Sequence, residues 1–333
     1  MTEYLKHIDP NTVKSGENAV EVDIDFDTEA TVAFRISRNN SGEFIHHDTG
    51  ESAHEFARNF SLMKHGSLEG VRYLGRHLAL AAISDAKFIS FLKSAETEVY
   101  ICSPGIYNVP SASNLLLRDV ASRLNAYFSY NKLPTLIVKD LTRVGESSLD
   151  YATQAVGDRG LFKSSETLMP KEFEGASVIY LDDIYITGTV LRRNKDRLRV
   201  EARVESSYFL VGAFMDQDVV VSSNGRIEDD LNKHAVDGSL NGGILEVLSG
   251  EFIPVQKTLK VVLHPDNFED LILSFPSKFN DERLIEIFRL IYTAACANDF
   301  WNRYDGKFVP ALKHIRKILM DKRELNNEGV LVN

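Results

Sequence analysis

Apolar runs in the middle of the chain alternate with segments whose apolar residues have helical spacing. The runs predict buried strands, expected over residues 98–103, 134–141, 177–183 and 208–216. The helical spacing predicts helices over about 113–128 and 189–204, and the stretch 142–174 is polar with no sustained period. Strand, helix, strand, loop, strand, helix, strand is the order typical of a mostly parallel, twisted sheet with helices on both faces. We therefore predict an α/β core over residues 91–220.

The segment before this core has a different pattern. Apolar and acidic residues alternate over 20–36, which predicts two strands, and a polar loop is expected over 38–51. Apolar spacing then predicts helices, expected over about 52–63 and 67–83. Residues 1–90 are therefore expected to form an N-terminal extension.

The last third of the chain is expected to form a mainly helical subdomain over residues 221–333. Residues 257–265 suggest one more strand because apolar residues alternate there. Two amphipathic helices are then expected, around residues 284–291 and 311–319.

One short segment of the core, VIYLDDIYITGTVL at 178–191, has a composition that suits a sugar phosphate. Ligands of open α/β sheets bind beyond the carboxyl ends of the strands, where Asp182 and Asp183 stand. The helix that begins after Gly188 offers backbone N–H groups and the positive end of its dipole to an anion, and Thr187 and Thr189 add hydroxyl groups. The two carboxylates suit sugar hydroxyls or a divalent cation.

This segment resembles the loop of type I phosphoribosyltransferases that binds phosphoribosyl pyrophosphate (PRPP). The resemblance implies that Asp182 and Asp183 bind the ribose hydroxyls and that Thr187, Gly188 and Thr189 hold the 5-phosphate. It extends over roughly 98–216.

The resemblance also assigns roles outside this segment. The loop ICSPGIYNVPSASN at 101–114 corresponds to the pyrophosphate loop, with Ser103, Pro104, Gly105 and also Lys139 as its candidates. A long mobile loop that closes over the site corresponds to about 142–170, and Arg143 and Arg159 there are candidate catalytic cations.

The implied activity is a Mg²⁺-dependent transfer of the phosphoribosyl group from PRPP to a nucleobase or another nitrogen nucleophile. Magnesium is expected to bind through PRPP, with Asp182 and Asp183 as its possible protein ligands. The sequence departs from the family where Ile186 and Val190 replace small or hydroxylic residues. These departures favour two rivals of the enzyme, of which the first is a non-catalytic sensor of PRPP or of a nucleotide.

A third hypothesis is a nucleotide-targeting effector of a bacterial stress or phage-defence system. It rests on Phe60, Lys64 and Gly66, which resemble positions in phosphoribosyltransferase-like proteins of such operons.

Composition and charge limit the kinds of partner and compartment that we expect for this chain. Lys and Arg number 38 against 48 Asp and Glu, a net charge of −10, which argues against a broad nucleic-acid surface. The basic residues of 192–203 are therefore expected to form a solvated helix face. The two cysteines exclude a disulfide framework. The polar first residues and the lack of a long apolar stretch predict a cytoplasmic protein that does not span a membrane. A protein partner or a homodimer is an open possibility.

Overall fold

The computed structural model describes residues 25–26, 28–145, 165–325 and 329–331. The chain divides into two compact units. Unit 1 contains the residues up to Ala57, Arg72–Ile106 and Ser113–Leu231; unit 2 contains Arg58–Val71, Tyr107–Ala112 and the residues from Asn232 onwards. None of the described helices is long and apolar enough to span a bilayer.

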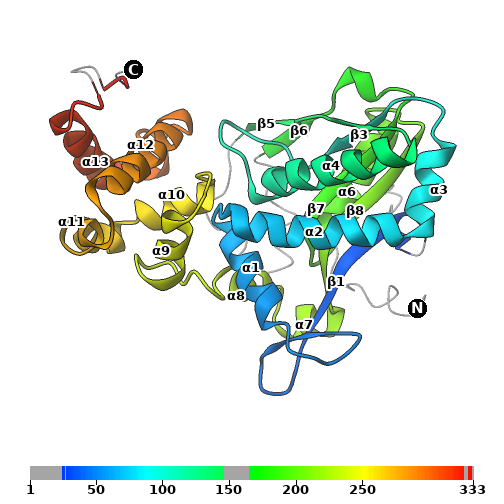
Figure 1. Ribbon diagram of the computed structural model, residues 1–333, viewed down its shortest axis with the longest axis horizontal. Helices are drawn as coiled ribbons and strands as arrows, with labels where there is room; N and C mark the ends of the chain where they lie inside the picture. The colour runs from blue at the N-terminus through cyan, green and yellow to red at the C-terminus, as the bar shows by residue number, and fades with distance from the viewer. Residues whose placement is uncertain (1–24, 27, 146–164, 326–328, 332–333) are drawn as a thin grey trace, which may run out of the picture. The chain divides into compact units, whose positions relative to one another are not determined.

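Unit 1 is an α/β structure built on a six-stranded sheet with the strand order β2-β1-β8-β7-β3-β4 (Figure 1). Its strands are β1 (Ala30–Arg38), β2 (Phe44–His46), β3 (Val99–Cys102), β4 (Leu136–Val138), β7 (Ser177–Tyr185) and β8 (Ser206–Met215). All neighbouring pairs are parallel except β1 and β2, which confirms the mostly parallel sheet. Every residue of β7 is buried, as expected for a central strand covered on both faces.

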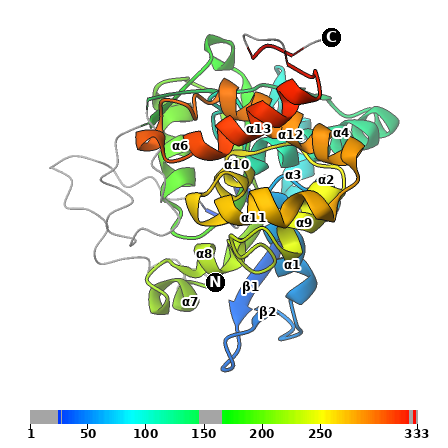
Figure 2. The same ribbon diagram turned by 90° about the vertical axis from the view of Figure 1, so that its left-hand side faces the viewer.

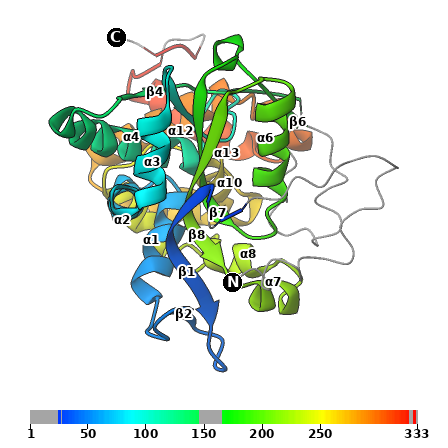
Figure 3. The ribbon, with the colours of Figure 1, turned by 90° about the vertical axis from the view of Figure 1, so that its right-hand side faces the viewer.

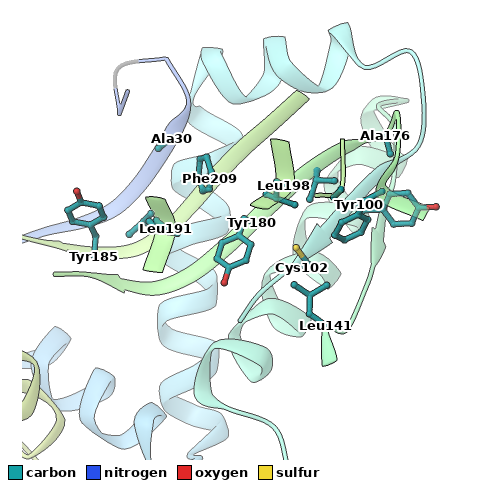
Figure 4. Close-up of a cluster of buried hydrophobic side chains, with 14 of the residues drawn as sticks. Ala30, Tyr100, Cys102, Leu141, Ala176, Tyr180, Tyr185, Leu191, Leu198 and Phe209 are labelled. Atoms are coloured by element: carbon teal, nitrogen blue, oxygen red, sulfur yellow. The ribbon is translucent and has the colours of Figure 1, made fainter. Parts of the chain in front are cut away.

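Helices cover both faces of this sheet, α6 on one and α2, α3 and α4 on the other (Figure 3). The helices of unit 1 are α3 (Ala86–Ser94), α4 (Ala112–Asn131), α6 (Thr189–Val200), α7 (Gln217–Ser222), α8 (Ile227–Asn232) and the short 3₁₀ helix η3 (Lys171–Phe173). The helices α1 (His54–Lys64) and α2 (Leu68–Ser84) have residues in both units. Leu191 and Leu198 of α6 pack with Tyr180 and Phe209 of the sheet (Figure 4).

The strands of the described chain differ from the sequence prediction in three segments. Only β1 is found in the described part of 20–36, because residues 25, 26, 28 and 29 precede it without strand structure. The expected polar loop over 38–51 contains β2, since Asn39 and Gly42 form a hairpin turn in which the Asn39 side chain accepts the N–H groups of Ser41 and Glu43. The polar stretch 142–174 contains an antiparallel pair, β5 (Thr142–Gly145) and β6 (Ser165–Leu168).

Unit 2 is helical after Asn232, and its helices α12 and α13 pack side by side (Figures 1 and 2). Its helices are α9 (Gly242–Ser249), α10 (Gln256–Val262), α11 (Phe268–Leu273), α12 (Asp281–Ala297) and α13 (Val309–Asp321). Three short 3₁₀ helices join them: η4 (Pro265–Asn267), η5 (Phe275–Lys278) and η6 (Tyr304–Gly306). The two helices expected from the apolar spacing of 284–291 and 311–319 are thereby confirmed.

The strand predicted over 257–265 is wrong, because this segment contains α10. Leu259, Val261 and Leu263 fit the alternation of a strand, but Leu259 and Val262 also fit one face of a helix, and both are buried. The Thr258 hydroxyl supports the helix, because it accepts the N–H of Val255 at the helix start, at 3.4 Å. It also donates to the His65 carbonyl at 2.5 Å.

Candidate functional site

The boundary between the carboxyl ends of β3 and β7 is the topological switch point of the sheet. From β3 the chain crosses through α4 to β4 on one side, and from β7 it crosses through α6 to β8 on the other. Open α/β sheets bind ligands where two such crossovers diverge. Both predicted ligand loops start at this place, because residues 103–105 follow β3 and residues 186–188 follow β7.

The two candidate carboxylates lie in the part of β7 that extends past the end of β3. Cys102, the last residue of β3, pairs with Tyr180, and β7 continues to Tyr185. Asp182 and Asp183 are 6% and 3% exposed. Successive side chains of a strand point to opposite faces, so the pair contributes one carboxylate to each face of the sheet end.

Asp182 belongs to an electrostatic group that includes Tyr180 and Arg143. Burial raises the pKa of Tyr180 well above its ordinary value, and the negative charge of Asp182 raises it further. The positive charge of Arg143 acts on the same phenol and lowers its pKa. The structure therefore brings Arg143, predicted from the sequence as a catalytic cation, into electrostatic range of Tyr180 in β7.

The Thr-Gly-Thr turn has the geometry of an anion cradle. Gly188 adopts the left-handed conformation, with φ 73° and ψ −4°, and caps the amino end of α6. The hydroxyls of Thr187 and Thr189 lie 2.9 Å apart. Within the described parts of the chain, the backbone N–H groups of Thr187, Gly188 and Thr189 donate to no oxygen. These donors and the positive end of the α6 dipole suit a phosphate.

Side chains that sequence reasoning missed hold the carbonyl groups of this turn. Gln217 Nε2 donates to Ile186 O at 3.1 Å, and Arg192 Nη2 donates to Thr187 O at 2.5 Å. Asn194 Nδ2 donates to Val190 O and to the Tyr180 hydroxyl, both at 2.8 Å. For Gln217 and Asn194 the only sequence signal is a polar amide at a position that the strand or helix pattern would bury, and Arg192 belongs to the basic segment 192–203.

The loop after β3 is fixed by side-chain donors at its start. Ser103 is buried, and Asn114 Nδ2 of α4 donates to Ser103 Oγ at 2.8 Å and to Pro104 O at 3.0 Å. Gly105 is buried against the β5–β6 pair, since a Cβ there would lie 3.1 Å from both Arg143 Cβ and the Thr167 side chain.

Arg143 is held beside this loop by the backbone. The Ile106 N–H donates to Leu141 O at 2.9 Å, and the Arg143 N–H donates to Ile106 O at 2.8 Å. The structure thus brings the predicted pyrophosphate loop and Arg143 together.

Two other predicted cations are not placed in the site. Lys139 Nζ forms an ion pair with Glu172 at 2.7 Å, and this contact lowers the pKa of the Glu172 carboxyl. Arg159 lies outside the described residues, as does most of the predicted mobile loop.

The basic residues of α6 are largely paired with carboxylates. Three ion pairs come from α6, Lys195–Glu29 at 2.5 Å, Arg197–Glu201 at 2.8 Å and Arg199–Asp196 at 3.6 Å, and Arg203 after the helix pairs with Glu174 at 3.5 Å. Arg193 and Arg199 are exposed, as a solvated helix face requires, whereas Arg197 is buried. Cys102 beneath the site is fully buried, and burial raises the pKa of its thiol, so it has no thiolate character.

Two solved structures are similar to part of this chain, the tetragonal and orthorhombic crystal forms of a hypoxanthine phosphoribosyltransferase from Staphylococcus aureus. Each is 12% identical and aligned over 74% of its own length, with TM-scores of 0.28 and 0.26 over 45% and 49% of this chain. No family model matches the chain, and neither does any curated protein sequence. At these values the likeness assigns no function to this chain.

Proposed function

We propose that this chain binds PRPP at the switch point of its sheet and transfers the phosphoribosyl group to a nitrogen nucleophile such as a nucleobase. One observation carries the proposal. The paired carboxylates of Asp182 and Asp183 lie at the end of the same strand that leads into an anion cradle at Thr187–Thr189. Carboxylates that accept hydrogen bonds from sugar hydroxyls, next to backbone N–H groups that bind a phosphate, match a pentose 5-phosphate.

The transfer forms a bond between the acceptor nitrogen and the anomeric carbon and breaks the bond from that carbon to the pyrophosphate oxygen. The nitrogen supplies the electron pair and later loses its proton, and pyrophosphate leaves with the electrons of the broken bond. Positive charge develops on the sugar, where one of the two carboxylates stabilises it: Asp182 lies with Tyr180 on the face of β7 that α6 covers, and Asp183 lies on the other face. Negative charge develops on the leaving group, where Arg143 and the N–H groups of Ser103–Gly105 are the candidate donors.

Magnesium fits this site only together with the substrate. Within the described ranges, no group of three or more His, Cys, Asp or Glu residues could hold a metal ion. Two carboxylates are suitable ligands for Mg²⁺, which usually keeps waters and binds substrate phosphates as well. Asp182, the carboxylate on the face that α6 covers, would therefore complete the coordination of a Mg²⁺ ion that neutralises the pyrophosphate.

A second candidate is a protein that binds PRPP as a sensor without turning it over. The phosphate turn supports it, because Ile186 is apolar and buried and Val190 offers no hydroxyl. The Lys139–Glu172 ion pair also supports it, since it occupies a cation that the pyrophosphate would need.

Calorimetry with PRPP and Mg²⁺ tests the binding that both candidates share. We expect the double variant Asp182→Asn plus Asp183→Asn to bind PRPP at least about 100-fold more weakly, because each hydrogen bond to a charged group contributes roughly 1.5–3 kcal/mol. The matched control is Glu269→Gln plus Asp270→Asn, an adjacent and exposed acidic pair on α11 that should leave binding unchanged. No binding by the wild type, or equal binding by the site variant, refutes both candidates.

Pyrophosphate release over a panel of nucleobases then separates the two candidates. Release that depends on one base establishes the transferase. Tight binding of PRPP without release for any base or amine establishes the sensor.

A further inference from the structure

Gln217 lies outside the strands, helices and ligand loops that the sequence predicts, yet it contacts the phosphate turn. It is the first residue of α7, directly after β8, and is 8% exposed. Its Nε2 donates to Ile186 O at 3.1 Å and to Met215 O at 2.9 Å. A side-chain amide nitrogen has two hydrogens, and both are used here. Gln217 therefore ties the end of β8 to the loop that follows β7.

Fixing the Ile186 carbonyl also fixes the direction of the next N–H group. A trans peptide unit is planar, with its C=O and N–H pointing in opposite directions. Because the Ile186 oxygen points to Gln217, the N–H of Thr187 points away from it. The Thr187 oxygen points to Arg192 Nη2 in the same way, so the N–H of Gly188 is directed as well.

We propose that Gln217 is a positioning residue for the phosphate turn, holding its peptide units so that the N–H groups of Thr187 and Gly188 face the bound 5-phosphate. This inference rests on the proposed function for its ligand. Gln217 does not touch the ligand, and it acts through the backbone of Ile186. Its amide is suited to this task because it is neutral and donates, whereas a carboxylate would face two carbonyl oxygens.

The chain offers a matched control in unit 2. Asn267 is 7% exposed, and its Nδ2 donates to two backbone carbonyls, Gly238 O and Val261 O, both at 2.8 Å. Asn267→Leu removes the same kind of contact as Gln217→Met. A role confined to stability should make the two variants behave alike.

The experiment measures the affinity of wild type, Gln217→Met and Asn267→Leu for ribose 5-phosphate and, separately, for Mg²⁺-pyrophosphate. We expect Gln217→Met to bind ribose 5-phosphate about 10- to 100-fold more weakly, the range for a lost hydrogen bond to a charged group. Its affinity for pyrophosphate should stay within about twofold, a change of less than one hydrogen bond. Asn267→Leu should leave both affinities unchanged. Equal loss of both ligands, or an equal loss in Asn267→Leu, overturns the inference.

A measurement without ligand separates this inference from the proposed function. The amide ¹⁵N and ¹H shifts of Thr187 and Gly188 should move in Gln217→Met and stay fixed in Asn267→Leu. If wild type binds no ribose 5-phosphate, the proposed function fails, and these shifts still decide whether Gln217 orients the turn. Unchanged shifts refute the inference. If Gln217→Met does not fold, Gln217→Asn, which keeps the amide but shortens its reach, replaces it, and the Thr187 shift then decides.

Discussion

The two loops that leave the switch point of the sheet differ in how they are held. The loop after β7 is fixed by side-chain donors on its carbonyl groups, from Gln217 and Arg192, which leaves N–H groups of the turn without acceptors in the described chain. The loop after β3 is fixed at its start by the Asn114 side chain, which donates to Ser103 Oγ and Pro104 O, and at its end by the backbone, since Ile106 pairs with Leu141 and Arg143. This second loop also has Arg143 of β5 beside it.

This difference teaches that the two halves of the proposed ligand depend on different kinds of interaction. Recognition of the 5-phosphate depends on the backbone conformation of 186–189. Recognition of the pyrophosphate depends on the packing of Gly105 against β5, which fixes Arg143. Substitutions in one loop should therefore affect one half of the ligand and leave the other half bound.

The largest effect is expected for Gly188→Ala. Gly188 has a positive φ, and a Cβ would collide with the hydroxyl and ring of Tyr185. We expect a loss of at least about 2 kcal/mol in the free energy of unfolding, from the left-handed conformation and from overpacking. Binding of ribose 5-phosphate should be lost, as measured by calorimetry, while Mg²⁺-pyrophosphate still binds.

Gly175→Ala is the control for Gly188→Ala. Gly175 has φ 71°, and no atom lies within 4 Å of its Cβ position. Only the backbone strain, about 1 kcal/mol, should then appear in urea denaturation. Equal effects of the two substitutions would contradict the role given to the contact between Tyr185 and Gly188.

Gly105→Ala should have the opposite selectivity and a smaller effect. Its Cβ would lie 3.1 Å from Arg143 Cβ and from Thr167, so β5 must shift by a few tenths of an ångström. We expect about tenfold weaker binding of PRPP and of pyrophosphate, corresponding to one weakened contact to a charged group. Binding of ribose 5-phosphate should not change. If both ligands weaken equally, the two loops do not act independently.

The smallest effect is expected for Glu172→Gln, which removes the carboxylate that pairs with Lys139. The pKa of Glu172 is lowered in the folded state, so the pair stabilises the fold above the ordinary glutamate pKa and loses this contribution as the pH falls through the lowered value. The stability difference between wild type and variant, measured by urea denaturation, should therefore be present at neutral pH and should shrink as the pH falls below the ordinary glutamate pKa.

The Glu172→Gln variant also tests whether Lys139 can bind the pyrophosphate. Release of Lys139 should raise the affinity for PRPP at neutral pH, since the ammonium group then becomes available to the pyrophosphate. An unchanged affinity would remove Lys139 from the candidate site.

The sequence predicts the local parts of the fold and of the site well. The buried run before Asp182 predicts β7, and the Thr-Gly-Thr turn predicts the start of α6, because strand pattern, turn and helix start are all within one short segment. Prediction fails where local signals are ambiguous, as in α10, whose apolar residues fit both periods. It also fails for β5 and β6, whose polar residues carry no strand pattern.

The long-range parts of the candidate site are not predictable from one sequence. Gln217 reaches Ile186 only because β8 lies next to β7 in the sheet, and that adjacency is a property of the topology. Asn194 looks like an ordinary polar residue of a basic helix until its contact with Tyr180 is known. Such contacts join residues that no spacing rule connects.

The burial of Cys102 has a practical consequence. The Cys102 thiol is buried in the core beside the sheet. Cys296, the other cysteine of the chain, is exposed and is therefore the one that a maleimide or iodoacetamide dye can reach. The indole nitrogen of Trp301, the single tryptophan, lies 3.4 Å from the Cys296 sulfur. A dye attached to Cys296 would therefore lie beside Trp301, which can quench it. The emission of this dye can report changes in unit 2 during titrations, with no engineered cysteine.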